Sequence, residues 1–392
     1  MSLAAAPPAE GLVERAAALV PMLLENAEAT ERERRLSPEQ FDALAEAGIF
    51  KMCAPKRYGG YEADFQTQCD VLAEVARGCP SSSWVATILS AMAWVVGTYP
   101  DDVQEEVFAS GDPRISGVFS PTGTVRRKNG GVVLNGRWGF NTGGHGSAWV
   151  VVNALLETDD GLGPPMSTIV RSSELTRLDD WYASGMAGTG SSTIVAEDVF
   201  VPAHRTLPLP EMVEGRYPTE RHNADSHYFN YPTASVLVVN AGGTPVGIAR
   251  GALDAFMARL PGRSITFTDY TDQAQAPVTH LAVGEAALKI QSAEAHISLA
   301  CSLLDDNPGV ELSRDQRIRA RAHISHATGL AREVVDRLFE ASGATAIQPH
   351  VPIQRFQRDI QALANHAIMS PTTTTELYGR HLCGLEPNTT LY

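Results

Sequence analysis

The chain has 392 residues, of which 44% are hydrophobic and 19% are charged, and its formal net charge is -14. This acidic balance argues against nucleic acid or an anionic membrane surface as a partner, although a local phosphate site stays open. The length is enough for two or three domains with an extensive core.

Targeting and redox signals favour a soluble cytoplasmic protein. Residues 1–10 lack the basic start and long apolar run of a secretory signal. The longest apolar stretch, Val85–Val96, is too short to span a bilayer, so no membrane partner is expected. The five cysteines are odd in number and have no metal-ligand spacing, which indicates reduced thiols.

Helices are predicted over roughly the first 110 residues. Apolar residues recur at helical spacing over Leu12–Asn26. A second helix begins at Ser37, where Pro38 suits the first turn and Gln40 completes a capping box. Two more helices are expected over 63–77 and 81–98, and the second is so apolar that it should be buried.

The pattern changes to strands between about residues 115 and 202. Glycine, asparagine and aspartate turns separate short β-branched runs, which are Val132–Leu134, Trp149–Val152, Thr168–Val170 and Thr193–Val195. These runs predict a compact β domain of about ninety residues.

Long helices return from about residue 233. The candidates are Val246–Leu260, Val278–Leu304, Arg314–Ser342 and Ile353–Leu382. Residues 206–232 follow no pattern and have no predicted role. We therefore expect an α+β multi-domain chain with a helical domain at 1–112, a central β domain with an irregular tail at 113–230, and a C-terminal four-helix bundle at 231–392.

Four segments carry a resemblance over nearly the whole chain: 47–60, 135–144, 185–192 followed by 199–202, and 338–366. Together they resemble the acyl-CoA dehydrogenase superfold. They are most similar to its two-component flavin-dependent monooxygenase branch, the aromatic hydroxylases. This resemblance implies a β-barrel-like central domain between two helical domains.

The segment 135–144 looks like the family's strand against the flavin ring. The resemblance implies that Trp138 and Phe140 contact the flavin and that the Thr142 hydroxyl reaches its N5 atom. Alternation would place Phe140 and Thr142 on the same side of an extended strand. The alternative is a hairpin in which Thr142 only stabilises the turn.

His366 stands where enzymes of this superfold that dehydrogenate acyl-CoA often place a carboxylate base. Glu376 lies ten residues further on, outside the matching frame. A histidine with a pKa near neutrality suits a phenolic proton or an oxygenated flavin, so His366 and Thr142 are the predicted catalytic residues. The alternative is a core histidine bonded to a helix carbonyl.

Further contacts follow from the same resemblance. It implies flavin contacts at Ser120, Ser191 and Arg263, and at Ser342 and Gly343 in a turn near a neighbouring subunit's flavin. Ser120 could instead cap a turn, and Arg263 could be a solvated charge at a helix end.

The predicted substrate pocket comprises Trp84, Met92 and Phe119, although buried aromatic residues are usually core. Met92 stands where some aromatic hydroxylases have a histidine, which favours an apolar polycyclic substrate over a small charged phenol. No metal is predicted, because the pairs His323/His326 and His222/His227 lack carboxylates at ligand spacing.

No nicotinamide-binding unit is visible, so electrons must come from the substrate or from another protein. The resemblance implies reduced FMN (FMNH2) or FAD supplied by a separate NAD(P)H flavin reductase. O2 would add to give a C4a-hydroperoxyflavin, which would hydroxylate a phenolic or polycyclic aromatic substrate in a homotetramer. The alternatives are an N- or S-oxygenase of an amino sugar or heterocycle, an atypical acyl-CoA dehydrogenase, and a flavin-binding scaffold.

Overall fold

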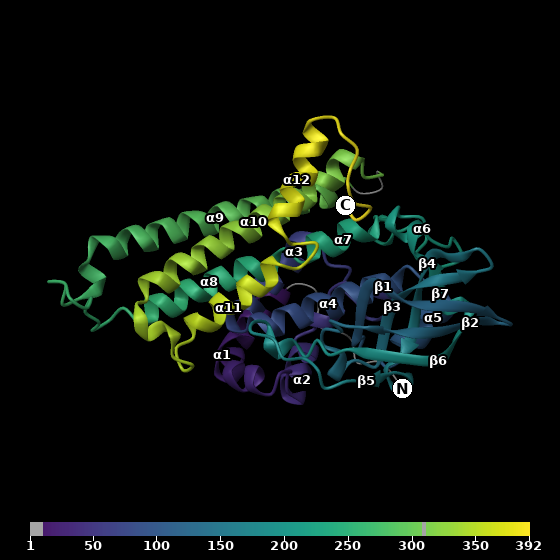
Figure 1. The fold of residues 1–392 in the computed structure, drawn as a ribbon, viewed down its shortest axis with the longest axis horizontal. Coiled ribbons are helices and arrows are strands. Elements are labelled where there is room, and N and C mark those ends of the chain that lie inside the picture. Colours follow the sequence, from purple (N-terminus) through teal and green to yellow (C-terminus); the bar gives the residue numbers. More distant parts are fainter. Residues whose placement is uncertain (1–10, 308–310) are drawn as a thin grey trace.

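The structure is a computed structural model that describes residues 11–307 and 311–392. Residues 1–10, in which a secretory signal was sought, lie outside the described residues. Figure 1 shows a long helical bundle at one end of the molecule and a sheet at the other, with the N-terminal helices against both. One apolar core joins the N-terminal helices to the bundle, and a second core lies under the sheet.

The first four N-terminal helices form where they were predicted, and the fifth was not predicted individually. They are α1 (Leu12–Arg32), α2 (Pro38–Glu46), α3 (Phe65–Gly78), α4 (Pro80–Gly97) and α5 (Asp101–Phe108). The capping box at Ser37 and Gln40 is present, because each side chain accepts the other residue's backbone N–H. The expectation that the apolar fourth helix is buried is confirmed, since nearly all of α4 is enclosed.

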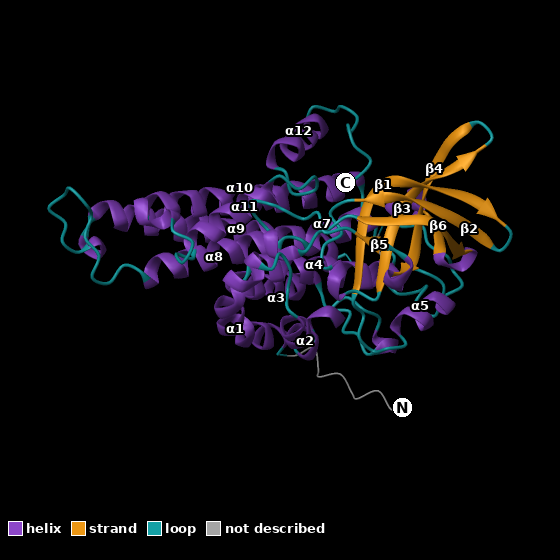
Figure 2. Cartoon of the chain, turned by 60° about the horizontal axis from the view of Figure 1, so that its bottom comes forward, coloured by secondary structure: helices purple, strands orange, loops and turns teal. Residues whose placement is uncertain are grey.

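The strands are β1 (Ile115–Lys128), β2 (Gly131–Trp138), β3 (Trp149–Thr158), β4 (Gly161–Arg171), β5 (Thr176–Arg177), β6 (Ile194–Pro202) and β7 (Thr206–Pro208). They form one sheet in the order β5-β6-β2-β1-β3-β4-β7, seen in orange in Figure 2. Only the pair β1–β3 is parallel among these strands. The four predicted runs coincide with β2, β3, β4 and β6, so the central β region is confirmed.

The segment without a predicted role, 206–232, contains β7 and a short helix, α6 (Leu209–Val213). Its remainder lies over α4. The indole N–H of Trp94 donates to the Tyr228 carbonyl at 2.8 Å, and Phe229 lies so close to Gly97 that a Cβ there would clash at 2.3 Å. The segment therefore covers the apolar helix α4.

The C-terminal helices are α7 (Thr233–Asn240), α8 (Gly243–Ala258), α9 (Pro277–Asp305), α10 (Arg314–Ala341), α11 (Ile353–Ala364) and α12 (Pro371–Leu382). The stretch Thr233–Ala258 is apolar enough to cross a membrane by composition, but 83% of its most apolar window is buried inside the protein. This arrangement is that of core helices. The boundaries proposed for the three domains stay predictions.

One predicted helix is wrong in its extent. The sequence predicted a continuous helix over 353–382, but α11 ends at Ala364 and α12 begins at Pro371. Proline lacks the N–H that a helix interior needs and disfavours helical backbone at the preceding residue, so Pro371 begins a new helix. His366 consequently stands in the turn 365–370, between two helices.

Candidate active site

Three hydroxyls from two loops form a buried chain. The Thr142 Oγ1 lies 2.8 Å from the Ser191 Oγ, which lies 2.7 Å from the Thr189 Oγ1. The Thr189 hydroxyl donates to the Met186 carbonyl at 2.8 Å. All three hydroxyl-bearing residues are buried. The structure thus brings together Thr142 and Ser191, two of the predicted flavin contacts.

The Met186 carbonyl fixes the direction of this chain. A hydroxyl carries one proton and two lone pairs. Because the Thr189 proton is used on the Met186 carbonyl, Ser191 must donate to Thr189, and Thr142 must donate to Ser191. The Thr142 oxygen therefore keeps a lone pair that no recorded bond within the described residues uses. The Thr142 oxygen is therefore available as a hydrogen-bond acceptor for a ligand.

Phe140 does not share a strand face with Thr142, so the predicted alternation is wrong. The strand β2 ends at Trp138, and Phe140 has a left-handed backbone with φ 63°. The Thr142 N–H donates back to the Phe140 carbonyl at 2.9 Å, which closes a tight turn. Phe140 is 74% exposed whereas Thr142 is 5% exposed, and the Phe140 ring meets Trp181 edge to face at 5.6 Å.

Trp138 is fully buried in the core under the sheet, and its indole N–H donates to the Asn153 carbonyl at 2.8 Å. Alternation along β2 points this ring into the second core, and its contact with the flavin stays a prediction. Ser120 lies exposed within β1 at a register shift, and not at a turn. Its contact with the flavin stays a prediction.

His366 lies beside Trp84, with the two ring centroids 5.1 Å apart and an edge-to-face angle of 68°. Among the described residues, the imidazole bonds to no helix carbonyl, and its Nδ1 only accepts a long hydrogen bond of 3.5 Å from the Ile368 N–H. The alternative of a core histidine bonded to a helix carbonyl is therefore excluded.

The environment of His366 disfavours its charged form. Burial in the surrounding protein, and then the nearby positive charge of Arg321, lower the pKa of His366 to about 4. The residue nevertheless keeps exposed surface. The ring is therefore neutral at pH 7, but the predicted pKa near neutrality is wrong, and His366 is a weaker base in this environment than the sequence indicated.

Helix α4 joins the two groups. Its Trp84 touches His366, while Val85 and Leu89 pack on Gly143 beside Thr142. A Cβ on Gly143 would lie 2.7 Å from the Leu89 Cδ1, so the turn needs glycine there. One short stretch of α4 thus places the hydroxyl chain and the imidazole near each other.

The other two predicted pocket residues are enclosed to different degrees. Met92 is buried against Gly117 of β1, and Phe119 is half-buried at the edge of the main core. Whether Trp84, Met92 and Phe119 contact a substrate stays a prediction.

Asp359 connects the hydroxyl chain to the helix that precedes His366, and the sequence did not identify this role. It is 4% exposed on α11, and its carboxylate accepts the Met186 N–H. Burial is the main reason why the pKa of Asp359 is raised to about 7. Only its place in the frame Arg358-Asp359 could have indicated it, because Met186 lies 173 residues away in the sequence.

Arg263 and Ser342 meet each other, but not Thr142. The Arg263 guanidinium donates to the Ser342 carbonyl at 2.9 Å, and Gly343 follows with a left-handed φ of 68°. Arg263 belongs to the loop between α8 and α9, and Ser342 directly follows α10. Figure 1 shows that the α8–α9 loop lies at the end of the bundle that is remote from the sheet. Within one described chain they do not complete the site at Thr142, so their flavin contacts stay predictions.

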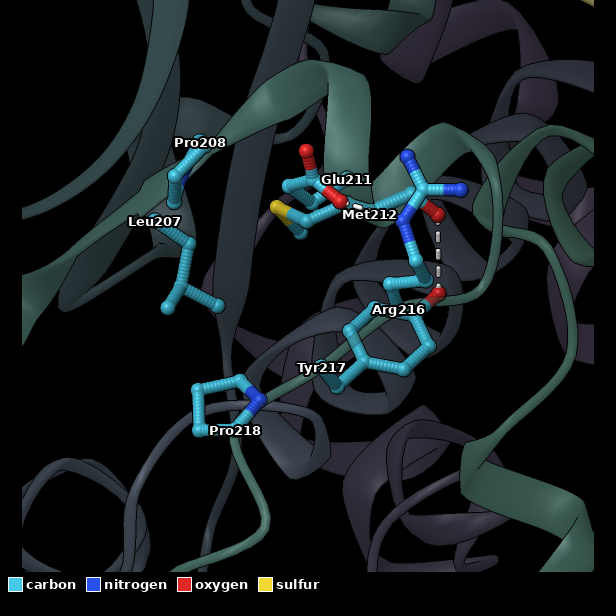
Figure 3. A pocket seen from close by; sticks show the side chains of 7 residues that line it. All are labelled: Leu207, Pro208, Glu211, Met212, Arg216, Tyr217 and Pro218. Carbon is cyan, nitrogen blue, oxygen red and sulfur yellow. Dashed lines mark hydrogen bonds and ion pairs between the residues drawn. The ribbon is translucent and has the colours of Figure 1, made fainter.

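A separate cavity of about 260 Å³ lies beside α6, in the segment that had no predicted role (Figure 3). An ion pair between Arg216 and Glu211 borders it, and the Tyr217 hydroxyl donates to the Met212 carbonyl at 3.1 Å. It is lined by Leu207, Pro208, Glu211, Met212, Arg216, Tyr217 and Pro218. None of these is a predicted site residue.

The rings of His323 and His326 both lie against a third histidine, His296. The His222 Nδ1 lies 2.7 Å from an Asp101 oxygen, and the His323 Nδ1 lies 2.9 Å from that of His296. In the part of the chain that the structure describes, no group of three or more histidine, cysteine, aspartate or glutamate residues has a geometry for a metal.

Two family models match this chain. Residues 11–109 match the acyl-CoA dehydrogenase N-terminal domain, and residues 240–371 match its C-terminal domain. The flavin-dependent monooxygenase oxygenase subunit HsaA of Rhodococcus jostii is 33% identical, over 95% of this chain and 98% of that protein. The chain belongs to the acyl-CoA dehydrogenase family, in its flavin-dependent monooxygenase branch.

Two more proteins support this membership. The FADH2-dependent resorcinol hydroxylase oxygenase component of a Rhizobium species is 30% identical, over 96% of this chain and 95% of that one. XiaF from a Streptomyces species, solved with FADH2 and glycerol, has a TM-score of 0.89 and 29% identity, with 97% of each chain covered. The predicted family, fold and flavin-dependent monooxygenase activity are confirmed.

Proposed function

We propose that the protein hydroxylates a phenolic or polycyclic aromatic substrate, using O2 and a reduced flavin delivered by a separate NAD(P)H flavin reductase. One oxygen atom enters the ring, the other leaves as water, and the reduced flavin supplies two electrons. The names of its relatives, an oxygenase subunit and an oxygenase component of resorcinol hydroxylase, support this division of labour.

The direction of the hydroxyl chain is the observation that carries the proposal. A reduced flavin has an N–H at N5, whereas the N5 of an oxidised flavin is an acceptor. Because Thr142 donates inward to Ser191, its oxygen can accept the N5–H of the reduced form. The donor set of this chain therefore fits a reduced flavin better than an oxidised one.

The remaining residues have roles that suit an oxygenase. The exposed Phe140 ring, set against Trp181, offers a surface for a planar ligand. A bound reduced flavin supplies the activation of O2. The neutral His366 would take the phenolic proton, which raises the electron density of the substrate ring. The enclosed α4 excludes water from the same side.

The proposal includes the homotetramer that the resemblance implies, in which the turn at Ser342 and Gly343 approaches the flavin of a neighbouring subunit. The choice between FMN and FAD, the identity of the substrate and a cytoplasmic location also belong to this proposal. Sedimentation that finds only monomers would remove the tetramer from it.

Two measurements test the function. Anaerobic titration with FMNH2, FADH2 and the two oxidised flavins should show tighter binding of the reduced forms. Turnover with isotopically labelled O2, using resorcinol and 2-naphthol as probe phenols, should place one labelled oxygen atom in the product. Equal affinity for both redox states would contradict the role of Thr142. Labelled product only from amines or thioethers would favour the N- or S-oxygenase alternative.

A further inference from the structure

Arg321 contacts the turn that carries His366. It lies on α10 and is only 6% exposed, and its guanidinium donates to the Ala367 carbonyl at 2.9 Å. Ala367 directly follows His366. Apart from its edge-to-face contact with Trp84, the only hydrogen bond of the imidazole within the described residues is the long one from the Ile368 N–H, so few bonds of the ring itself fix its position. The bond from Arg321 acts on the backbone that carries the ring.

The guanidinium is in turn held by the final segment of the sequence. Its other terminal nitrogen donates to the Leu391 carbonyl, while its Nε is buried without a hydrogen-bond partner. Arg321 thus lies between two backbone carbonyls, one in the His366 turn and one near residue 392. This arrangement joins the last residues of the chain to the candidate active site.

No acidic side chain compensates this charge within the described residues. Burial alone lowers the pKa of Arg321, with no opposing effect from a carboxylate. A buried cation without an anionic partner is costly, so stability does not explain it. An apolar side chain of similar length would avoid that cost. A charge placed beside His366 explains why position 321 is an arginine.

We propose that Arg321 is a positioning residue for His366. Its guanidinium is held by the Leu391 carbonyl and donates to the Ala367 carbonyl. The second bond fixes the backbone next to His366 and so the position of the imidazole against Trp84. This inference rests on the proposed function for its catalytic meaning, but the geometry of the turn can be tested without turnover.

Arg317 offers a matched control on the same helix. It lies one turn before Arg321 and is 7% exposed. Its Nε donates to the Tyr392 carbonyl at 3.1 Å, and it forms an ion pair with Glu214 at 3.0 Å. It therefore holds the same final segment, but it neither bonds to the turn 365–370 nor acts on the pKa of His366.

The first test follows the turn itself. The N–H groups of Met369 and Ser370 both donate to the His366 carbonyl at 2.9 Å, so their hydrogen exchange reports whether the turn is formed. In the full-length protein, Arg321→Met should increase exchange at both amides, and Arg317→Met should leave it unchanged. Unchanged exchange in Arg321→Met would overturn the proposal.

The second test separates positioning from a merely structural role. Ring titration of labelled histidines, assigned with His366→Asn, measures the pKa of His366 directly. Within the described residues, Arg321 is the only charged group that shifts the pKa of His366. The residue that packs on the ring from α4, Trp84, carries no charge. Arg321→Met should raise the pKa of His366, and Arg321→Lys, which keeps the charge, should restore it. An identical titration in all variants would count against the proposal.

Turnover then divides the two hypotheses. With the phenol that yields labelled product, Arg321→Met should lower kcat by on the order of 10- to 10²-fold with little change in KM. As the pH is lowered, the activity of Arg321→Met should be lost at a higher pH than that of the wild type, because its His366 has the higher pKa. If His366→Ala retains full coupled turnover, His366 is not the base and the proposed function loses that step. The exchange and titration results would still decide whether Arg321 positions the ring.

Discussion

The hydroxyl chain at Thr142 and the imidazole turn at His366 pack on the same stretch of α4, but they are held in opposite ways. Thr142 is buried and linked through Ser191 and Thr189 to a carbonyl, so every proton in the chain has a fixed direction. His366 has no strong bond of its own, and the structure fixes only the backbone next to it. The Thr142 hydroxyl is therefore held by its own hydrogen bond, whereas the His366 imidazole is held mainly through the backbone of the next residue.

This difference suits the two tasks. A group that recognises a cofactor benefits from one fixed donor and acceptor pattern. A base that accepts a proton benefits from a neutral ring with a free nitrogen, because a bond to that nitrogen would compete with the substrate. The comparison predicts that the two sides respond differently to substitution.

The largest effect is expected at His366. His366→Ala should lower kcat for the probe phenol by about 10²- to 10⁴-fold, because a positioned base typically contributes that much. Reduced-flavin affinity and thermal stability should change little, since His366 as a whole residue is exposed. Steady-state kinetics and anaerobic titration measure both. His350→Ala, an exposed histidine before α11, is the control. Equal rates in the two variants would break the comparison.

The next effect concerns Asp359 and depends on pH. Its pKa is about 7 in the folded protein, above its unfolded value, so its contribution to stability is complete at low pH and is lost as pH rises towards 7. Asp359→Asn does not titrate. Its unfolding free energy relative to wild type should therefore increase from pH 4 to pH 8, by a few kcal/mol at about 1.4 kcal/mol per pKa unit. Urea unfolding at several pH values measures this.

Asp180→Asn is the control of opposite sign. Asp180 also accepts a backbone N–H, from Thr193 at 2.9 Å, but here that bond, and then the Thr193 side chain, lower the pKa of Asp180. Its relative stability should fall as pH rises. Parallel pH dependence in the two variants would refute the assignment of Asp359.

A smaller effect is expected at Thr142. Thr142→Val removes the acceptor while Ser191 and Thr189 keep their own bond, and one such hydrogen bond contributes about 0.5–1.5 kcal/mol. Reduced-flavin affinity should fall roughly 2- to 10-fold by the same estimate. Oxidised-flavin affinity should stay the same. Thr168→Val, at a fully buried threonine that donates to the Val152 carbonyl in the sheet, should leave both affinities unchanged.

The smallest effect on stability is expected at Phe140. Phe140→Ala should change the unfolding free energy by less than about 0.5 kcal/mol, because the ring is largely exposed. It should nevertheless weaken reduced-flavin binding. Phe267→Ala is closely matched, since Phe267 is also exposed and has a left-handed φ of 60°. Equal flavin affinity in the two variants would show that the Phe140 ring does not contact the cofactor.

The sequence alone was enough for the elements and for several functional residues. Local periodicity and capping predicted the helix that begins at Pro38 and the buried strands, because these signals depend only on neighbouring residues. The resemblance identified Thr142, Ser191 and His366, and the structure brings the first two into contact.

Tertiary structure decided how these residues are presented. The turn after β2 separates Phe140 from Thr142, and the second core encloses Trp138. The contact that Arg321 makes with Ala367 joins residues 46 positions apart, and no local pattern encodes it. Such contacts depend on how whole elements pack, because only packing brings distant segments together and buries a charge or turns a ring outward.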